Sequence, residues 1–419
     1  MKIMLVSVGT RGDMEPFLAI GEILKKQGHQ IICLFPYQFE NLVVNSGFKF
    51  HSLGSKFIEL LQTAEGKKAM SGGKFGFKKL KAYAKLISKQ GAANKEITQN
   101  QEKYIEQENP DLILHHTKAI YPILWETKNK NKTVVISPVP YLNYVKGHSH
   151  LVFNSNFGNI INKLTYKLVN SGIIYNTFFT QKYLKIQKQR ISKKTIKNIL
   201  KNQKTIYSIS PSIFPQPSYW NDNVKVLGFH ERVKTNNWQP ETALHNFIEK
   251  HSKILFITFG SMVNELPVKN TRTLIEIVTK NKIPTIINTH SGGLVKPKDH
   301  NLTSIYFTKS IPYEWIFPKV YAVIHHGGSG TTQTALKYGC ANLIIPHILD
   351  QYVWNKIIYQ KKAGPIGIDI SKISMQNLEP KILDLWNNAI YKKHAKKLST
   401  QIQNEDYEAE IIDFIFKKI

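Results

Sequence analysis

The chain has 419 residues, of which 42% are hydrophobic, and a formal net charge of +28. This length supports two domains with separate cores, and no apolar run approaches the ~20 residues of a membrane-spanning helix. The two cysteines, Cys33 and Cys340, lie in apolar runs of separate halves, so we expect buried thiols in a reducing cytoplasm and exclude a disulfide scaffold.

Short apolar runs alternate with helical segments through the first half of the chain. The predicted strands are Ile3–Val8, Gln30–Phe35, Leu112–His115 and Thr133–Ser137. A helical segment from Met14 to Gln27 separates the first two strands. The opening run is interpreted as a strand because residues 9–13 do not form a signal-cleavage pattern. Strands that alternate with helices indicate a parallel sheet with right-handed crossovers.

Many of the lysines lie between Lys67 and Lys204. Within Lys74–Ile87, bulky apolar residues at positions 80, 83, 86 and 87 fall near one helical face. This pattern is typical of a basic helix that lies on anionic lipid; the alternative is a core-facing helix with a solvated lysine face. The stretch Leu151–Leu200 interleaves aromatic residues with lysines, which suits either a lipophilic acceptor site or ordinary helix packing.

The second half repeats the alternation of strands and helices after a proline-rich boundary. Prolines cluster from Ser210–Pro217 to Trp238–Pro240, where the hydrophobic periodicity lapses. The predicted strands that follow are Ile254–Thr258, Thr285–Ile287, Ile305–Phe307, Ala322–His325 and Asn342–Ile345. We therefore expect a second parallel-sheet domain, with a linker between the two halves.

A glycine-rich turn follows the fourth strand of the second half. The turn comprises His325, His326, Gly327, Gly328, Ser329, Gly330 and Thr331, and a helical pattern runs on from there to Tyr338. A strand, a glycine turn and a helix N-terminus together form an anion cradle, because free N–H groups and the helix dipole converge there. The spacing excludes a P-loop and a dinucleotide fingerprint. The alternative is that the glycines only turn the chain.

The pair Asp350–Gln351 follows the next buried run, Ala341–Pro346. It is therefore predicted in the loop after that strand, at the carboxyl edge where open parallel sheets bind ligands. A carboxylate accepts hydrogen bonds and a carboxamide both donates and accepts them, a combination that suits vicinal hydroxyls. Beside the anion cradle, this pair predicts a site for a sugar nucleotide.

These motifs resemble the donor signature of the family 1 UDP-glycosyltransferases, closest to the sterol 3-beta-glucosyltransferase and glycopeptide-antibiotic branch. The matching segments are His325–Thr332, Pro346, Asp350–Gln351, Ile311–Pro318, Val8–Asp13 with Pro16, Ala19, Gly28 and His29, Val226–Phe229 with Trp238 and Pro240, and Phe259–Met262. The resemblance spans nearly the whole chain in order, although residues 57–203 carry no matching motif. It implies an α/β protein of the GT-B fold, with two Rossmann-like parallel-sheet domains that face an interdomain cleft.

The resemblance also implies a domain organisation. Residues 1–215 form an N-terminal acceptor-binding domain, 216–240 a linker, and 241–398 a C-terminal nucleotide-sugar-binding domain. Residues 399–419 form a C-terminal helix that packs back on the first domain.

Residue roles follow from the resemblance at the matching positions. Asp13 is implied as the general base, in a glycine-flanked loop after the first strand; the alternative is that it caps the helix entering at Met14. The donor-binding positions are Thr10, Arg11, Gly12, Ser261, Ile311, Tyr313, His325, Gly327, Gly328, Ser329, Gly330, Thr331, Asp350 and Gln351. For the acceptor side we expect His115, His148 and Phe153.

The reaction expected is metal-independent and inverting. No Asp-X-Asp motif is present to hold a divalent ion on a diphosphate, and no cofactor is expected beyond the co-substrate. No second carboxylate is evident for a covalent intermediate, so a single displacement would give a β product from an α donor. Plant members stack a tryptophan on uracil, whereas this chain reads Thr308–Tyr313 there. Despite this departure, the resemblance implies UDP, with TDP as the alternative.

The predicted function is transfer of a hexose from a UDP-sugar, UDP-glucose first, to a hydroxyl of a sterol, lipid or aglycone. The alternatives are a sugar-nucleotide epimerase or lipid-linked-sugar transferase of the same fold, and a basic nucleic-acid-binding protein. No recognised nucleic-acid-binding module supports the last, so no specific nucleic acid is expected as a partner. The expected location is cytoplasmic, peripheral on the inner face of an anionic membrane.

Overall fold

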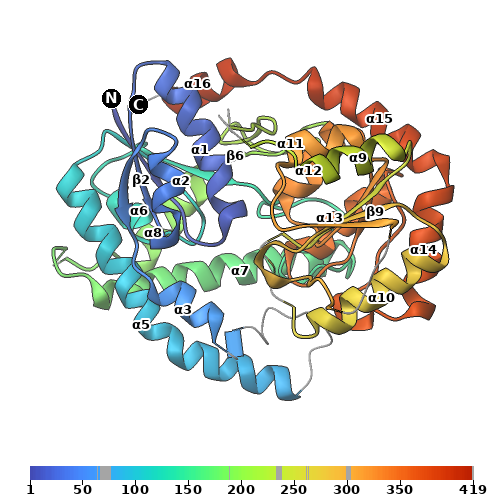
Figure 1. Cartoon of the computed structure of the whole chain (residues 1–419). Helices are drawn as coiled ribbons and strands as arrows, with labels where there is room; N and C mark the ends of the chain where they lie inside the picture. Colours follow the sequence, from blue (N-terminus) through green and yellow to red (C-terminus); the bar gives the residue numbers. More distant parts are fainter. Residues whose placement is uncertain are drawn as a thin grey trace. The chain divides into compact units, whose positions relative to one another are not determined.

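The computed structural model describes residues 1–63, 65–66, 77–187, 189–232, 238–260, 262, 264–298 and 303–417. The chain forms two compact units, which are considered separately (Figure 1). Unit 1 contains Met1–Thr63, Tyr83–Val233 and Asp406–Ile419, and unit 2 contains Ala64–Ala82 and Lys234–Glu405.

The centre of unit 1 is a seven-stranded parallel sheet in the order β3-β2-β1-β4-β5-β6-β7. Its strands are β1 (Lys2–Val6), β2 (Gln30–Phe35), β3 (Lys49–Ser52), β4 (Leu112–His115), β5 (Thr133–Ser137), β6 (Lys204–Tyr207) and β7 (Val224–Val226). The order reverses between β1 and β4. In open α/β sheets a reversal of this kind leaves a crevice beyond the carboxyl ends of the two strands, where ligands bind.

The helices of the first half and of the C-terminus flank this sheet. They are α1 (Arg11–Lys26), α2 (Glu40–Val44), α3 (Lys56–Gln62), α5 (Phe77–Glu108), α6 (Tyr121–Trp125), α7 (Asn159–Thr180), α8 (Lys193–Asn202) and α16 (Glu408–Phe416), with short 3-10 turns at Tyr37–Phe39 and Gln181–Tyr183. The basic pattern predicted for Lys74–Ile87 lies outside the residues whose side chains the structure describes.

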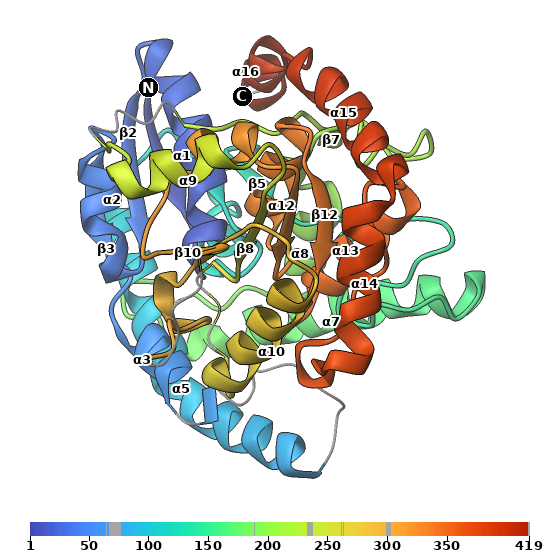
Figure 2. The ribbon, with the colours of Figure 1, turned by 45° about the vertical axis from the view of Figure 1, so that its right-hand side comes forward.

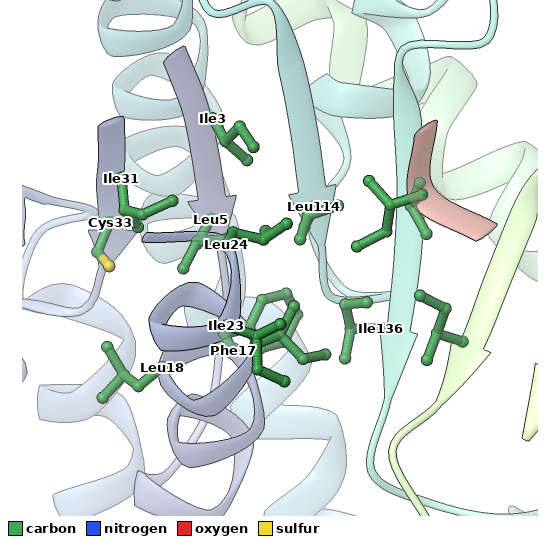
Figure 3. Close-up of a cluster of buried hydrophobic side chains, with 14 of the residues drawn as sticks. Ile3, Leu5, Phe17, Leu18, Ile23, Leu24, Ile31, Cys33, Leu114 and Ile136 are labelled. Carbon is green, nitrogen blue, oxygen red and sulfur yellow. The ribbon is translucent and has the colours of Figure 1, made fainter. Parts of the chain in front are cut away.

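One core of unit 1 lies between α1 and the sheet. Leu5 of β1 and Leu114 of β4 pack with Phe17 and Leu24 of α1, and all four are fully buried (Figure 3). Burying each such side chain stabilises the fold by about 1.5–3 kcal/mol. Side chains of α16, including Ile411, complete the cluster, so the C-terminal helix belongs to unit 1.

Helix α1 begins at Arg11, three residues before the predicted Met14. The reason is a capping box: Thr10 is the N-cap, and the Asp13 carboxylate accepts a hydrogen bond from the Thr10 backbone N–H at 2.7 Å. Such reciprocal capping satisfies amides that the helix leaves unpaired. The prediction of the helix start was wrong, and Asp13 lies inside the first turn.

Unit 2 contains a five-stranded parallel sheet in the order β10-β9-β8-β11-β12. Its strands are β8 (Leu255–Thr258), β9 (Thr285–Asn288), β10 (Ile305–Thr308), β11 (Ala322–His325) and β12 (Ala341–Ile344). Its helices are α9 (Thr242–Lys250), α10 (Pro267–Lys280), α11 (Tyr313–Ile316), α12 (Ser329–Lys337), α13 (Asp350–Gln360), α14 (Met375–Asn387) and α15 (Ala389–Gln403), with 3-10 turns at His290–Gly292, Phe317–Lys319 and Ile370–Lys372. The strand order reverses between β8 and β11.

Two further expectations were wrong. A single helix was predicted from about Ser399, but α15 ends at Gln403 and α16 begins at Glu408. Between the two helices the Asp406 carboxylate accepts a hydrogen bond from the Glu408 N–H, a local side-chain bond that competes with continuation of the helix. The pair Asp350–Gln351 was predicted in a loop, but it opens α13.

Both cysteines are buried free thiols, as predicted. Within the described part of the chain, no helix has the length and apolar character needed to span a membrane.

Candidate functional site

In unit 1, Asp13 lies beyond the carboxyl end of β1, next to the end of β4. Its Oδ2 accepts hydrogen bonds from Thr10, from the backbone N–H at 2.7 Å and from the hydroxyl at 3.1 Å. Its Oδ1 lies 3.4 Å from His116 Nε2 and 3.6 Å from Lys118 Nζ. The side chain is 19% exposed. The carboxylate is thus positioned from four directions and still accessible, at the place where the strand order reverses.

The ring of His116, which lies 3.4 Å from Asp13, is neutral. Burial and the nearby charge of Lys118 lower the pKa of His116 to about 3. Its Nδ1 accepts the Lys118 backbone N–H at 3.3 Å, which assigns the ring proton to Nε2. The protonated Nε2 is therefore the ring nitrogen that lies near Oδ1 of Asp13.

Asp13 is ionised at neutral pH. Burial by itself would raise the pKa of this carboxyl, but Lys118, His116 and the hydrogen bonds from Thr10 together outweigh burial. The pKa of Asp13 consequently lies below its ordinary value of 3.8. A carboxylate held charged in a partly buried crevice can accept a proton from a hydroxyl placed against it.

The turn before α1, which leads to Asp13, depends on Gly9. A Cβ added to Gly9, whose φ is +150°, would lie 2.2 Å from Oδ2 of Asp13. Behind the loop, Arg11 contacts Glu15 at 2.9 Å, and Glu15 also accepts hydrogen bonds from Arg232. Arg11 is thus engaged with its own helix, while Gly12 has open space around it: an added Cβ would meet only Thr10 Oγ1, at 3.9 Å.

The three residues predicted on the acceptor side lie in different environments. His115 is fully buried; its Nδ1 lies 3.1 Å from the His116 carbonyl and its Nε2 2.7 Å from the Gln203 amide nitrogen. His148 stacks on Tyr141 with 3.8 Å between ring centroids. Phe153 is exposed. Both ring nitrogens of His115 are therefore engaged inside unit 1. Acceptor binding by all three residues stays a prediction.

In unit 2, the first histidine of the glycine-rich turn is also held by its own fold. His325 ends β11, and its Nδ1 accepts the Gly327 N–H at 3.1 Å. Its Nε2 lies 2.9 Å from Asn342 Oδ1. Burial lowers the pKa of His325 to about 4, so the ring is neutral and both of its nitrogens are engaged.

The second histidine, His326, lies between two glycines. A Cβ on Gly260 would lie 2.8 Å from its Cε1, and a Cβ on Gly328 would lie 2.5 Å from its Nε2. Gly260 follows β8, so the turns after β8 and β11 meet where the strand order reverses. Among the described residues, Nδ1 of His326 and Nε2 of the nearby buried His347 find no hydrogen-bond partner. Buried polar atoms of this kind commonly mark functional sites.

The N-terminus of α12 presents backbone amides without a side-chain cap. Gly328 is the N-cap residue, and a Cβ on Gly330 would meet nothing within 4 Å. Ser329 is buried, and its hydroxyl accepts a hydrogen bond from the Gln333 side chain at 3.1 Å. Thr331, in the first turn, is partly exposed. Backbone amides at the positive end of a helix can form an anion site, and Gly330 leaves open space beside them.

The start of α13 lies against this turn. Gly327, at φ +92°, approaches closely: an added Cβ would lie 3.2 Å from the Gln351 carbonyl oxygen. Gln351 uses its side-chain Oε1 to accept the N–H groups of His347 and Ile348, at 2.8 and 3.1 Å. Leu349, just before Asp350, has a φ of +37°, a strained value that clusters at functional sites. Asp350 is partly exposed in the first helical turn.

The remaining donor positions of unit 2 are placed as follows. Ile311 is buried in a core cluster. The Tyr313 hydroxyl lies 2.9 Å from Thr258 Oγ1, and its ring stacks on Phe317, so this side chain packs inside unit 2. Ser261 lies outside the described residues. The donor positions of unit 2 that surround the turn are brought together, whereas Thr10, Arg11 and Gly12 belong to unit 1.

Sequence reasoning did not identify Lys118, His326 and His347 as site residues. Lys118 and His116 follow β4, about a hundred residues from Asp13, and their proximity depends on the strand order. The described part of the chain holds no group of three His, Cys, Asp or Glu side chains arranged as metal ligands, and metal independence stays a prediction.

Two family models match the ends of the chain. Residues 3–108 match the glycosyltransferase family 28 N-terminal domain. Residues 297–417 match the erythromycin biosynthesis protein CIII-like C-terminal domain.

Curated relatives match the chain over its whole length. Sterol 3-beta-glucosyltransferase UGT80A2 of Arabidopsis thaliana is 27% identical, over 100% of this chain and 66% of the relative. A sterol 3-beta-glucosyltransferase of Saccharomyces cerevisiae is 25% identical, over 100% of this chain and 35% of the relative. The chain thus spans about two thirds of the plant relative and about a third of the yeast one.

Solved structures share the fold. The glycotransferase of kitacinnamycin superposes with a TM-score of 0.68 at 12% identity, covering 99% of this chain and 98% of that one. The Streptomyces glycosyltransferase SsfS6, complexed with thymidine diphosphate, superposes with a TM-score of 0.60 at 14% identity, covering 99% of each chain. At these identities the likeness establishes a common fold.

Proposed function

We propose that this chain, a homologue of the glycosyltransferases with the GT-B fold, transfers a hexose from a nucleoside diphosphate sugar to a hydroxyl of a lipophilic acceptor. Similarity over the whole of this chain to parts of sterol 3-beta-glucosyltransferases of a plant and a yeast supports glucose as the sugar and a sterol or similar lipid as the acceptor. UDP is the proposed nucleotide. TDP is the alternative, because the SsfS6 structure holds thymidine diphosphate.

The observation that carries the proposal is the environment of Asp13. An ionised, partly exposed carboxylate lies at the strand-order reversal of unit 1, with a neutral imidazole 3.4 Å from Oδ1. As base, it would accept the proton of the acceptor hydroxyl while that oxygen forms its bond to the anomeric carbon. The bond from the anomeric carbon to the diphosphate oxygen breaks, and the diphosphate leaves with the electron pair.

The leaving diphosphate needs positive charge or hydrogen-bond donors. We assign this role to the uncapped amides at the start of α12, with His326 beside them. His325 would have to give up its contact with Asn342 to donate to a phosphate. For the sugar hydroxyls, the Asp350 carboxylate and the Gln351 Nε2 remain as candidates, since Oε1 of Gln351 holds its own loop.

One displacement at the anomeric carbon inverts its configuration. An α-linked donor would then give a β-linked product, without a metal ion or a cofactor. NMR of the anomeric proton of the product checks this, and an α product would contradict it.

The test of the function is a panel of UDP- and TDP-sugars, each incubated with cholesterol, plant sterols and long-chain alcohols. Mass spectrometry reads the products. We expect a mass increase of one hexose on a sterol, and a rise in thermal midpoint with the same donor, because a ligand that binds the native state stabilises it. If no donor raises the midpoint and no acceptor gains a hexose, the proposal fails.

A further inference from the structure

Helix α7, the long green helix of Figures 1 and 2, exposes many large apolar side chains, although Ile174 and Phe178 pack against the core of unit 1. Its buried side chains are Asn162, Thr165, Tyr166, Thr177 and Thr180. Its large exposed side chains are Ile160, Ile161, Leu164, Leu168, Tyr175 and Phe179, here called the α7 apolar face. An ordinary surface helix buries its apolar residues and exposes its polar ones, so this pattern calls for a partner.

The exposed apolar side chains of α7 share one side of the helix. Ile160, Leu164 and Leu168 are spaced by four residues, and Tyr175 and Phe179 continue the stripe two turns later. Ile160 is 79% exposed and Leu168 is 63% exposed. The segment just before the helix adds exposed Val152, Phe153 and Phe157. Contiguous exposed apolar surface of this kind marks an interaction site.

Hydrogen bonds hold the helix in this rotation. On its buried side, Asn162 accepts the Phe157 N–H at 2.9 Å, and Thr165 Oγ1 accepts the His150 N–H at 2.9 Å. The Tyr166 hydroxyl donates to the Ser149 carbonyl at 3.2 Å. Turning the apolar face inward would break all three bonds and leave buried polar groups unpaired. These hydrogen bonds therefore fix the rotation of α7 so that its apolar face points outward.

The charge around α7 is positive. Between Thr127 and Asn221 the sequence has 15 Lys and Arg residues and no Asp or Glu. Lys163 and Lys167 are exposed on α7 itself. Lys193 lies with Nζ 3.8 Å from the Tyr175 ring centroid, so a cation also borders the aromatic end of the stripe. An apolar stripe flanked by lysines complements a surface that is apolar beneath and anionic above.

We propose that the α7 apolar face docks on the surface of an anionic lipid bilayer. The aliphatic and aromatic side chains enter the boundary between headgroups and acyl chains, and the lysines meet lipid phosphates. Isoleucine and leucine have no favourable contact with a nucleic-acid backbone, so charge alone does not explain the face. The proposal is independent of glycosyl transfer, because docking requires no sugar nucleotide.

The test is sedimentation of the full chain with vesicles of phosphatidylcholine alone, or with about one third phosphatidylglycerol. We expect about tenfold tighter binding to the anionic vesicles. The triple variant Ile160→Ser/Leu164→Ser/Leu168→Ser is expected to bind them about a hundredfold more weakly. Lys163→Gln/Lys167→Gln is expected to lose about tenfold on the anionic vesicles alone.

The matched control is Ile390→Ser on α15, where the side chain is 54% exposed but belongs to unit 2. It should bind vesicles as the wild type does, and circular dichroism should match for all variants, since the replaced side chains are exposed. The proposal is overturned if the triple variant binds like the wild type, if the control loses as much, or if lipid charge has no effect. It also fails if vesicles do not bind and sedimentation equilibrium shows that the face instead joins two copies or a partner protein.

Discussion

Lys118 is the residue whose removal tests the electrostatics of Asp13 most simply. Its positive charge helps to hold the pKa of Asp13 below 3.8. The active form of a base is the carboxylate, which exists above this pKa; Lys118→Met raises the pKa, so activity should be lost at a higher pH on acidification. We expect the acid limb of kcat/KM to move up by about 0.5–1 pH unit.

The pH profile of Lys397→Met, an exposed lysine of unit 2, is the control for loss of one charge. It should keep the acid limb of the wild type. An unchanged acid limb in Lys118→Met would contradict the claim that Lys118 lowers the pKa of Asp13.

Gly9 is a second residue that affects the position of Asp13. Gly9→Ala places a methyl group 2.2 Å from Asp13 Oδ2 in the unrelaxed backbone, so the loop must shift. We expect a loss of about 1–3 kcal/mol in the free energy of unfolding, as for other overpacked sites. Gly172→Ala is the matched helix variant, because its added Cβ meets nothing within 4 Å; it should stabilise by about 0.5–1 kcal/mol. Equal urea midpoints for the two variants would contradict this.

At the scale of elements, the start of α12 makes a sharp prediction. Gly330→Ala should leave the thermal midpoint unchanged or raise it slightly, because the added methyl has open space and alanine favours a helix over glycine. If a diphosphate occupies that open space, the methyl group should displace it and weaken donor binding about tenfold, which is about 1.4 kcal/mol. Isothermal titration with UDP-glucose measures this, and an unchanged Kd would place the diphosphate elsewhere.

Gly328→Ala provides the comparison on the same turn. Its added methyl would lie 2.5 Å from His326 Nε2, so both the thermal midpoint and the donor affinity should fall. Comparison of the two variants distinguishes a methyl group that clashes inside the protein from one that clashes only with the bound ligand.

The strands predicted with the observed bounds are buried along nearly their whole length. β2, β4, β5 and β11 were predicted with the observed bounds, because each is a continuous apolar run. Three strands were missed. β3 and β7 form the edges of their sheet, and β6 is next to the edge; all three are short and contain lysine, which breaks the apolar run.

The site was predictable where one segment builds it and not where several do. The glycine-rich turn of unit 2 could be predicted from adjacent residues, because the end of a strand, the glycines and the start of a helix lie within ten positions. The contact of Asp13 with His116 depends on β4 lying beside β1, which sequence periodicity does not specify. The ring of His326 lies against Gly260, which follows strand β8. Sequence periodicity does not predict this contact between two separate turns.

At the scale of the whole molecule, buried histidines predict sensitivity to acid. Burial lowers the pKa of His115, His150, His325 and His347 to about 4, while unfolded histidine titrates near 6.5. Their neutral native form contributes stability that is fully present above pH about 6.5 and is lost as the unfolded chain takes up protons below it.

The free energy of unfolding should therefore fall between about pH 6.5 and pH 4, by up to about 1.4 kcal/mol per pH unit for each histidine. Thermal midpoints across this range measure the fall. A midpoint that stays constant down to about pH 4 would show that these rings are not buried and neutral in the native protein.

The central claim concerns the carboxylate of unit 1, and kinetics of Asp13→Asn test it most directly. Asparagine keeps an oxygen that can accept the Thr10 N–H, so the helix start and donor binding should survive. We predict that hexose transfer to a sterol, followed by mass spectrometry, falls by about 10²–10⁴-fold in kcat while the thermal shift given by UDP-glucose is retained. A variant that transfers hexose within about threefold of the wild-type rate would contradict the assignment of Asp13 as the base.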